Sequence, residues 1–496
     1  MWEIENYRPI NLINVDLKIY AKVLCSRMKP FLSLVLNESQ YAQPDKNIMQ
    51  LVTLMRDINY EMGINTSDSF LISLDFEKAF DNVNHKYIEK VLSRMHFPAI
   101  FIKAFKSLYK NASSKLIING GLSKRISIKS GIRQGCPFSR DIFTLTINPL
   151  IEYLASNESI ISYISLSRQQ FLSLAFVDDL NVILQCLKSV FNVLHAIRLF
   201  GNISGFRLNH GKTKGIFYNN RNNIQVSALP QITWVENLTI LGVNFGTDAW
   251  RNEQWNDKLL DYKKDIGFFK TKKPTLDAKA MLCKFKLCSV FSYLGQVYPV
   301  PENVGKKIDD CLLSFIVPHK KTFMDITDFA LPRHYGGYGF SNINLNLKLL
   351  YVKPIMQYVN EKVNHGSLSK EMYYIEYNLG QQLSLKFGLP INNVTPHAFK
   401  PNDFYKRMFD IICLHKITLD ELMEGKVISI YKRIMTEIGE FRGRNSTENY
   451  GKLHRNIFPN YLKTFNYKLQ FDLLPVKGKF YEHNIRCRCE SNIPIL

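Results

Sequence analysis

The chain has 496 residues, of which 46% are hydrophobic, so it holds enough apolar material for about two to four packed units and is not intrinsically disordered. Lysine and arginine number 64 against 43 aspartates and glutamates, a net charge of +21. This excess is typical of nucleic-acid-binding proteins, but a basic soluble protein without such a partner has the same composition. No apolar run reaches the roughly 18 residues of a membrane span, so we expect no membrane partner.

The number and spacing of the cysteines indicate the redox environment of the protein. There are nine, scattered without the spacing of a disulfide framework. Free thiols in this pattern are typical of a reducing compartment, so we expect an intracellular protein.

Helical and strand patterns alternate along the first 250 residues. Apolar residues at helical spacing predict helices over 16–36, 47–62, 85–95, 99–109, 140–155 and 187–205, with Pro30 kinking or ending the first. Short β-branched runs predict strands over 70–74, 206–218 and 232–245, a hairpin around Gly120-Gly121 and a second around "VDD" at 177–179. This order predicts an α+β fold resembling a ferredoxin-like split βαβ unit, with helices on one face of a mostly antiparallel sheet.

The chain becomes helical and lysine-rich after about residue 250. Nine lysines stand against three aspartates between Lys258 and Lys286. Such a charge run is either a solvated helix face or a surface that grips a nucleic-acid duplex.

Three acidic residues stand at strand ends. Asp75 follows the strand 70–74, and Asp178 and Asp179 occupy the turn of the second hairpin. These elements are neighbours in a split βαβ sheet, so we expect the three carboxylates to converge. Close carboxylates need cations between them, and two Mg²⁺ ions roughly 3.5–4 Å apart clamp the attacking and leaving oxygens of a phosphoryl displacement. Taken singly, acids in a turn are equally explained by local hydrogen bonding.

Three stretches, in this order and spacing, resemble the palm motifs of LINE-type (non-LTR) retrotransposon reverse transcriptases. They are "LDFEKAFDNV" at 74–83, "GIRQGCPFS" at 131–139 and "AFVDDL" at 175–180. Residues 6–30 are similar to the upstream fingers segment of that group, and 334–353 resemble a block downstream of its palm. The resemblance covers about residues 6–353, and its specificity comes from the combination of motifs.

The resemblance implies a role for each matching residue. The metal ligands are Asp75, Asp178, Asp179 and the Phe76 carbonyl. Phe80 is a steric gate that excludes the ribose 2′-hydroxyl, while Gln134 and Gly135 pack on the nucleotide and the template. Lys212 donates a proton to the departing pyrophosphate, and Leu241 and Gly242 form the primer grip. Lys46 stands where the family has a Gly-Arg pair, and it keeps the charge without the bidentate fork for a phosphate. Core packing for Phe80, a loop hydrogen bond for Gln134, a solvated lysine for Lys212 and a plain β-turn for Leu241-Gly242 are the competing interpretations.

The implied fold is a right-hand polymerase. Fingers occupy 1–70 with an insertion near 85–130, the palm 70–250, a lysine-rich helical thumb 251–345, and a helical C-terminal extension, which we expect to be truncated, 346–496. The implied activity is RNA-directed DNA synthesis from a primer 3′-hydroxyl with dNTPs and two Mg²⁺. The partners are an RNA template and a DNA primer, and the setting is the nucleus and cytoplasm.

The two ends of the chain carry further expectations. Cys487 and Cys489 are one residue apart and His483 is the only histidine near them, so we expect no zinc. LINE proteins carry an endonuclease upstream, which a missing domain or another chain would supply. Two alternatives remain open: a catalytically dead retroelement remnant that only binds nucleic acid, and a group II intron-type maturase.

Overall fold

A computed structural model describes residues 11–218, 229–317, 325–365, 368–391 and 402–441. The chain divides into two compact units, Met1–Arg251 and Asn252–Leu496, and each is described by itself. The second part of the C-terminal extension, with Cys487, Cys489 and His483, lies outside the described residues, so the zinc prediction stays a prediction.

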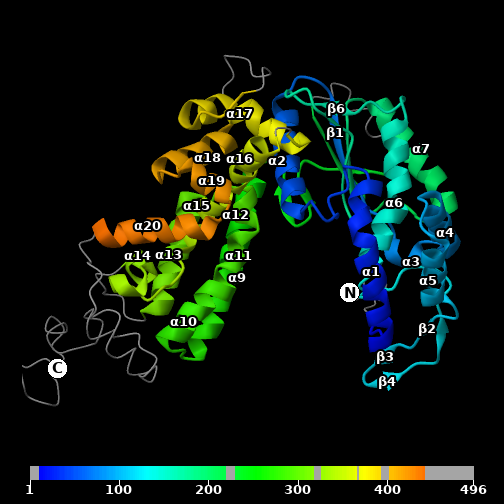
Figure 1. Cartoon of the computed structure of the whole chain (residues 1–496), viewed down its shortest axis with the longest axis horizontal. Coiled ribbons are helices and arrows are strands. Elements are labelled where there is room, and N and C mark those ends of the chain that lie inside the picture. The colour runs from blue at the N-terminus through cyan, green and yellow to red at the C-terminus, as the bar shows by residue number, and fades with distance from the viewer. Residues whose placement is uncertain (1–10, 219–228, 318–324, 366–367, 392–401, 442–496) are drawn as a thin grey trace, which may run out of the picture. The chain divides into compact units, whose positions relative to one another are not determined.

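The first unit combines a sheet with helices (Figure 1). Its helices are α1 (Val15–Val35), α2 (Ile48–Ile64), α3 (Ala79–Asn82), α4 (His85–Arg94), α5 (Ala99–Tyr109), α6 (Ser139–Ser156) and α7 (Leu187–Ser204). Its strands are β1 (Ser69–Leu74), β2 (Ser113–Ser114), β3 (Ile117–Ile118), β4 (Gly121–Leu122), β5 (Ile126–Ser127), β6 (Tyr163–Ile164), β7 (Gln170–Phe171), β8 (Ser173–Phe176), β9 (Asp179–Leu184), β10 (Lys214–Tyr218), β11 (Thr233–Trp234), β12 (Leu238–Ile240) and β13 (Val243–Phe245). Pro30 lies inside α1 and does not end it.

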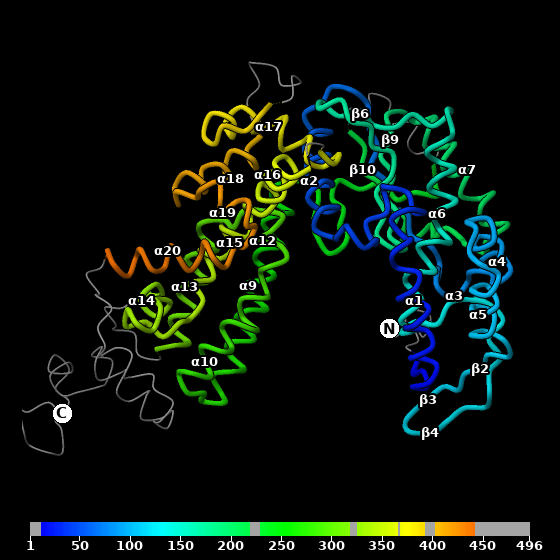
Figure 2. Tube along the Cα trace, in the orientation of Figure 1, coloured from blue at the N-terminus to red at the C-terminus, as the bar shows by residue number. Residues whose placement is uncertain are grey.

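The main sheet has the split βαβ order that the sequence predicts. Its strands run β11-β10-β1-β9-β8, with β1 antiparallel to both β10 and β9, β9 antiparallel to β8, and only β10–β11 parallel. Helices α3 to α6 separate β1 from β8 in the chain, and α7 separates β9 from β10. β9 and β10, on either side of β1, are labelled on the trace in Figure 2.

Both faces of the central strands are buried. Alternate residues Phe70, Ile72 and Leu74 of β1 join a core that also contains residues of α4, α6 and α7, which contact one another (Figure 1). The opposite face carries Leu71 and Ile183, both fully buried, and α2 contacts β8. The expectation that helices cover one face only is therefore wrong, because the strands are apolar on both sides.

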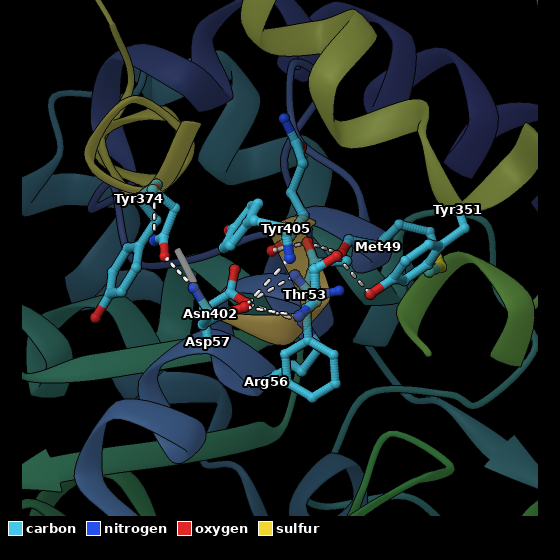
Figure 3. A network of polar contacts seen from close by, with 11 residues as sticks. Met49, Thr53, Arg56, Asp57, Tyr351, Tyr374, Asn402 and Tyr405 are labelled. Carbon is cyan, nitrogen blue, oxygen red and sulfur yellow. Dashed lines mark hydrogen bonds and ion pairs between the residues drawn. The ribbon is translucent and has the colours of Figure 1, made fainter. Parts of the chain in front are cut away.

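Helix α2 begins at a capping box, in which the side chain of Asn47 accepts from the amides of Met49 and Gln50. Further along it, Arg56 and Asp57 form a buried ion pair of 2.6 Å (Figure 3).

Within its described residues the second unit is entirely helical. Its elements are α9 (Asp248–Thr271, which begins in the first unit), α10 (Leu276–Leu282), a π-helix (Cys283–Leu287), α11 (Ser289–Ser292), α12 (Leu294–Val297), α13 (Glu302–Ile316), α14 (Ile326–Ala330), a 3-10 turn (Arg333–Tyr335), α15 (Ile343–Tyr351), α16 (Lys353–Asn364), α17 (Lys370–Phe387), α18 (Asp403–Leu414), α19 (Leu419–Glu424) and α20 (Val427–Phe441). Asn402 caps α18 by accepting from the amides of Phe404 and Tyr405 (Figure 3). Of the helices described, none has the length and apolarity needed to cross a membrane.

Candidate active site

The strand end that carries Asp75 lies beside the turn that carries Asp178 and Asp179. Leu74 pairs with Leu180 in the antiparallel β1–β9 ladder, so Asp75, which follows Leu74, and Asp179, which precedes Leu180, lie at the same end of the two strands. Asp75 and Asp178 are half-buried and Asp179 is exposed. The backbone thus brings together the two elements that the sequence motifs single out.

The side chains do not form a ready-made metal centre. Across the described part of the chain, no group of three or more His, Cys, Asp or Glu side chains is arranged to hold a metal ion. The donor set still suits a hard divalent cation, since it offers carboxylate oxygens at a solvent-accessible edge. Phe76 adds a carbonyl that accepts from no backbone amide among the described residues.

The backbone of Asp75 is held on both sides by the turn that contains Lys212. The Asn209 amide donates to the Asp75 carbonyl at 2.8 Å, and the Asp75 amide donates to the buried hydroxyl of Thr213 at 3.3 Å. The Lys212 amide donates to the Asn209 side chain within this turn, and the Lys212 side chain is exposed. Lys212 therefore belongs to a segment fixed against the first acidic residue.

Phe76 and Phe80 both follow Asp75 but lie in different surroundings. Phe76 is buried and packs edge-on against Phe206, with ring centroids 5.5 Å apart. Phe80 is half-buried on α3 and stacks on Phe143 of α6 at 4.5 Å. The Phe80 ring is thus supported by the core on one side, and both the gate and the packing interpretations are compatible with this position.

The loop 131–139 docks onto α3. The Gly131 amide donates to the Val83 carbonyl at 2.9 Å, and the Ile132 amide donates to the Phe80 carbonyl at 2.6 Å. A side chain at Gly131, where φ is +84°, would meet the Asp81 carbonyl oxygen at 2.5 Å. The position of this loop is therefore coupled directly to that of Phe80 by a backbone hydrogen bond.

Gln134 and Gly135 stand at the open side of this loop. Gln134 is half-buried and its carbonyl accepts from the Asn11 amide at 3.1 Å, while Gly135 is exposed with φ of +94°. Glycine adopts this left-handed conformation without strain and lets another group approach the backbone closely.

Lys46 is directed toward its own loop. Its ammonium donates to the Glu38 carbonyl and lies 4.6 Å from the centroid of the Tyr41 ring. The side chain is half-buried. A phosphate at this position would have to compete with those contacts.

Leu241 and Gly242 form the two-residue turn between β12 and β13. Their φ angles are +49° and +76°, the pair of left-handed residues that a type I′ hairpin needs. β12 contacts β10, so the hairpin is attached to the edge region of the main sheet.

Sequence reasoning missed two groups that support the acids. Thr213 holds the Asp75 amide, and Gln40, fully buried in the segment before α2, binds the backbone of Val177 beside Asp178. Thr213 could have been found from the sequence, because it directly follows the candidate residue Lys212. No local pattern pointed to Gln40.

Comparison with known proteins agrees with this geometry. Residues 3–245 match the family model described as reverse transcriptase (RNA-dependent DNA polymerase). Among curated proteins, the chain is 29% identical to the transposon TX1 uncharacterized 149 kDa protein of Xenopus laevis, over 52% of this chain and 18% of that protein. It is 24% identical to a Pol polyprotein from the type-1 retrotransposable element R2 of Popillia japonica, over 42% of this chain and 29% of that protein. The chain therefore spans less than a third of the length of these relatives.

Solved telomerase structures are also similar. One is apo telomerase from Candida tropicalis truncated from the C-terminal domain, with a TM-score of 0.33 and 16% identity over 47% of each chain. Another is telomerase from Candida albicans in complex with a TWJ fragment of telomeric RNA, with a TM-score of 0.38 and 13% identity over 68% of this chain and 51% of that one.

The family match and the strand-end acids define residues 3–245 as a reverse transcriptase domain. The curated relatives are more specific: over this region the chain is similar to proteins of the TX1 transposon and the R2 retrotransposable element, which supports a reverse transcriptase of the non-LTR retrotransposon kind. Enzymes of this family use divalent metal ions such as Mg²⁺.

Proposed function

We propose that this chain is an RNA-directed DNA polymerase, which extends a primer 3′-hydroxyl on an RNA template with dNTPs. The observation that carries the proposal is the β1–β9 register: Leu74 pairs with Leu180, so Asp75 and Asp179, the next residue on each strand, lie at the same end of the sheet. The family match over residues 3–245 supports the same chemistry.

The site divides the work among its residues. Asp75, Asp178, Asp179 and the Phe76 carbonyl would hold two Mg²⁺ ions, which when bound supply Lewis-acid activation of the hydroxyl and neutralise the triphosphate. Phe80 closes the nucleotide pocket on the side of the 2′-hydroxyl. Lys212, in the turn fixed against Asp75, donates a proton to the departing pyrophosphate. Gln134 and Gly135 border the nucleotide and template, and Leu241 with Gly242 holds the primer.

The larger parts would follow the right-hand arrangement. The sheet with α6 and α7 forms the palm, and α1 and α2 belong to the fingers together with the insertion near 85–130 that contains α4 and α5. The helices between 251 and 345 form the thumb, and the helices from 346 onward form the C-terminal extension. Exposed lysines of α9, such as Lys264, would contact phosphates of the RNA–DNA duplex without reading its sequence. Binding should therefore weaken steeply as salt rises.

Primer extension tests the proposal. The wild-type chain with Mg²⁺, dNTPs and a DNA primer annealed to an RNA template should produce extended DNA. Asp178→Asn should reduce the rate of nucleotide addition by more than about 100-fold while duplex binding stays unchanged. Removing a metal ligand should lower the rate more than removing a residue that only orients a ligand, which typically costs roughly 10- to 100-fold. Asp248→Asn, which changes an exposed carboxylate on α9 that pairs with Arg251, is the matched control.

A binding-only retroelement remnant is the second candidate. It is favoured by one observation: the acidic side chains of the described chain are not arranged as a metal-holding group. In that case the wild-type chain binds the primer–template duplex but adds no nucleotide at any Mg²⁺ concentration. A group II intron-type maturase would instead need its own intron RNA to be bound in preference to other templates.

A further inference from the structure

The turn that presents Asp178 and Asp179 is intrinsically unfavourable. Val177 is the first of the two residues that join β8 to β9, and its φ is +59°. Two-residue hairpin loops of this kind favour glycine or asparagine there, because a β-branched side chain clashes with its own backbone in the left-handed region. Val177 is also buried, with 9% of its surface exposed. Something outside the hairpin must hold this conformation.

Gln40 makes the contacts that would do so. Its side-chain oxygen accepts from the Val177 amide at 3.1 Å, and its side-chain nitrogen donates to the Val177 carbonyl at 3.4 Å. One amide side chain thus binds both backbone polar groups of the left-handed residue. Because Gln40 is fully buried, water does not compete for these bonds.

Gln40 is itself fixed relative to the sheet. The Ala175 amide donates to the Ser39 carbonyl at 2.8 Å and the Tyr41 amide donates to the Ala175 carbonyl at 2.7 Å, which makes a parallel bridge between Gln40 and Ala175. The side-chain oxygen of Gln40 also accepts from the Ala42 amide at 3.0 Å. The segment before α2 is therefore held in a fixed register beside β8, and this places the side-chain amide of Gln40 next to Val177.

We infer that Gln40 is a positioning residue for the metal-binding acids. It holds Val177 in the left-handed conformation and, through it, fixes the direction in which Asp178 and Asp179 leave the hairpin. The Gln40 side chain is bonded to backbone groups of Val177 and Ala42, so it acts on the acids through the turn. The inference rests on the proposed role of the acids as metal ligands, but the clamp on the turn is a structural claim that can be measured without metal.

Hydrogen exchange tests the clamp in the metal-free full-length protein. Gln40→Leu keeps the size of the side chain and removes both bonds, so the amide of Val177 loses its acceptor. Exchange in the peptide that spans 173–180 should become faster, whereas the peptide of α7 should be unchanged. Gln43→Leu is the matched control, since Gln43 is a buried glutamine in the same segment and its side chain has no hydrogen bond to the turn among the described residues. Unchanged exchange at 173–180 in Gln40→Leu would overturn the inference.

Metal affinity tests the consequence. Titration with Mn²⁺, followed by electron paramagnetic resonance, should show binding that Asp178→Asn abolishes. Gln40→Leu should weaken this binding by roughly 10- to 100-fold, as expected for a group that orients ligands from behind, and Gln43→Leu should not. Adding Val177→Gly to Gln40→Leu should restore much of the affinity, because glycine adopts the positive φ without help.

The outcomes separate the two claims. If the wild-type chain shows no Asp178-dependent Mn²⁺ binding, the proposed metal site fails, while the exchange result still decides the clamp. If Mn²⁺ binds and Gln40→Leu has wild-type affinity, the positioning role is wrong. If Gln40→Leu does not fold, the double variant replaces it: it should match Val177→Gly alone in affinity, and weaker binding by the double variant would contradict the inference.

Discussion

The amide of Ile132 donates a 2.6 Å hydrogen bond to the carbonyl of Phe80, which ties the loop 131–139 to the helical turn after Asp75. On the other side of α3, the Phe80 ring stacks on Phe143 of α6. Phe80 is therefore held by one backbone hydrogen bond and one ring contact, and its predicted role as a steric gate can be tested directly.

Shortening the Phe80 side chain should change nucleotide selection. Phe80→Val removes the ring that would meet a 2′-hydroxyl, so incorporation of ribonucleotides relative to dNTPs should rise roughly 10- to 100-fold. The variant should also lose about 1–2 kcal/mol of stability, because the half-buried ring leaves its contact with Phe143. Competition assays with paired dNTP and rNTP measure the first effect. Phe101→Val is the control, and an equal rise in that variant would refute the gate.

A side chain at Gly131 should destabilise the loop. Gly131→Ala places a Cβ 2.5 Å from the Asp81 carbonyl oxygen at φ of +84°, so the free energy of unfolding should fall by about 3 kcal/mol. Gly120→Ala supplies the comparison, since Gly120 has φ of +80° but no atom within 4 Å of the added Cβ, and it should cost about 1 kcal/mol. Denaturant unfolding of both variants gives the difference, and equal losses would contradict the docking geometry.

Removing the Lys212 ammonium should slow the chemical step without weakening duplex binding. Lys212→Ala loses the proposed proton donor, so the single-turnover rate of nucleotide addition should fall roughly 10²-fold. Lys214→Ala is matched to it, because Lys214 is an exposed lysine two residues along on β10. If the single-turnover rate falls by the same factor in both variants, Lys212 contributes only surface charge and not a proton.

Asp309 in the second unit should make stability depend on pH. Burial raises the pKa of its carboxyl to about 6, although the Asn344 side chain donates to one oxygen. A folded pKa above the unfolded value favours the protonated form, so this contribution is complete below about pH 4 and is lost as the pH rises through about 6. Asp309→Asn should therefore stabilise the protein by about 1–2 kcal/mol at pH 8, allowing for partial solvent screening, and have little effect at pH 4. Urea unfolding at both values checks this, and a larger gain at pH 4 would reverse the assignment.

Local patterns were sufficient for many elements. The apolar run before Asp75 predicts β1, the helical spacing of 187–205 predicts α7, and the paired glycines at 120–121 predict the hairpin of β3 and β4. Each of these depends on residues close together in the chain. Pro30 does not end α1, so of the two predicted outcomes the helix end is wrong; α1 contacts α5 and α6, and residues near Pro30 in the chain carry no information about this packing.

The sequence by itself determined the acids, the order of the motifs and the family, because these depend on residue identity and spacing. Only the tertiary structure decided that Leu74 pairs with Leu180, that Thr213 holds the Asp75 amide and that Gln40 binds Val177. Such contacts join segments far apart in the chain, and a residue's neighbours in sequence carry no information about which distant backbone group it will meet when the sheet assembles. The sequence therefore identifies the residues of the candidate site, while the fold decides how their side chains are positioned relative to one another.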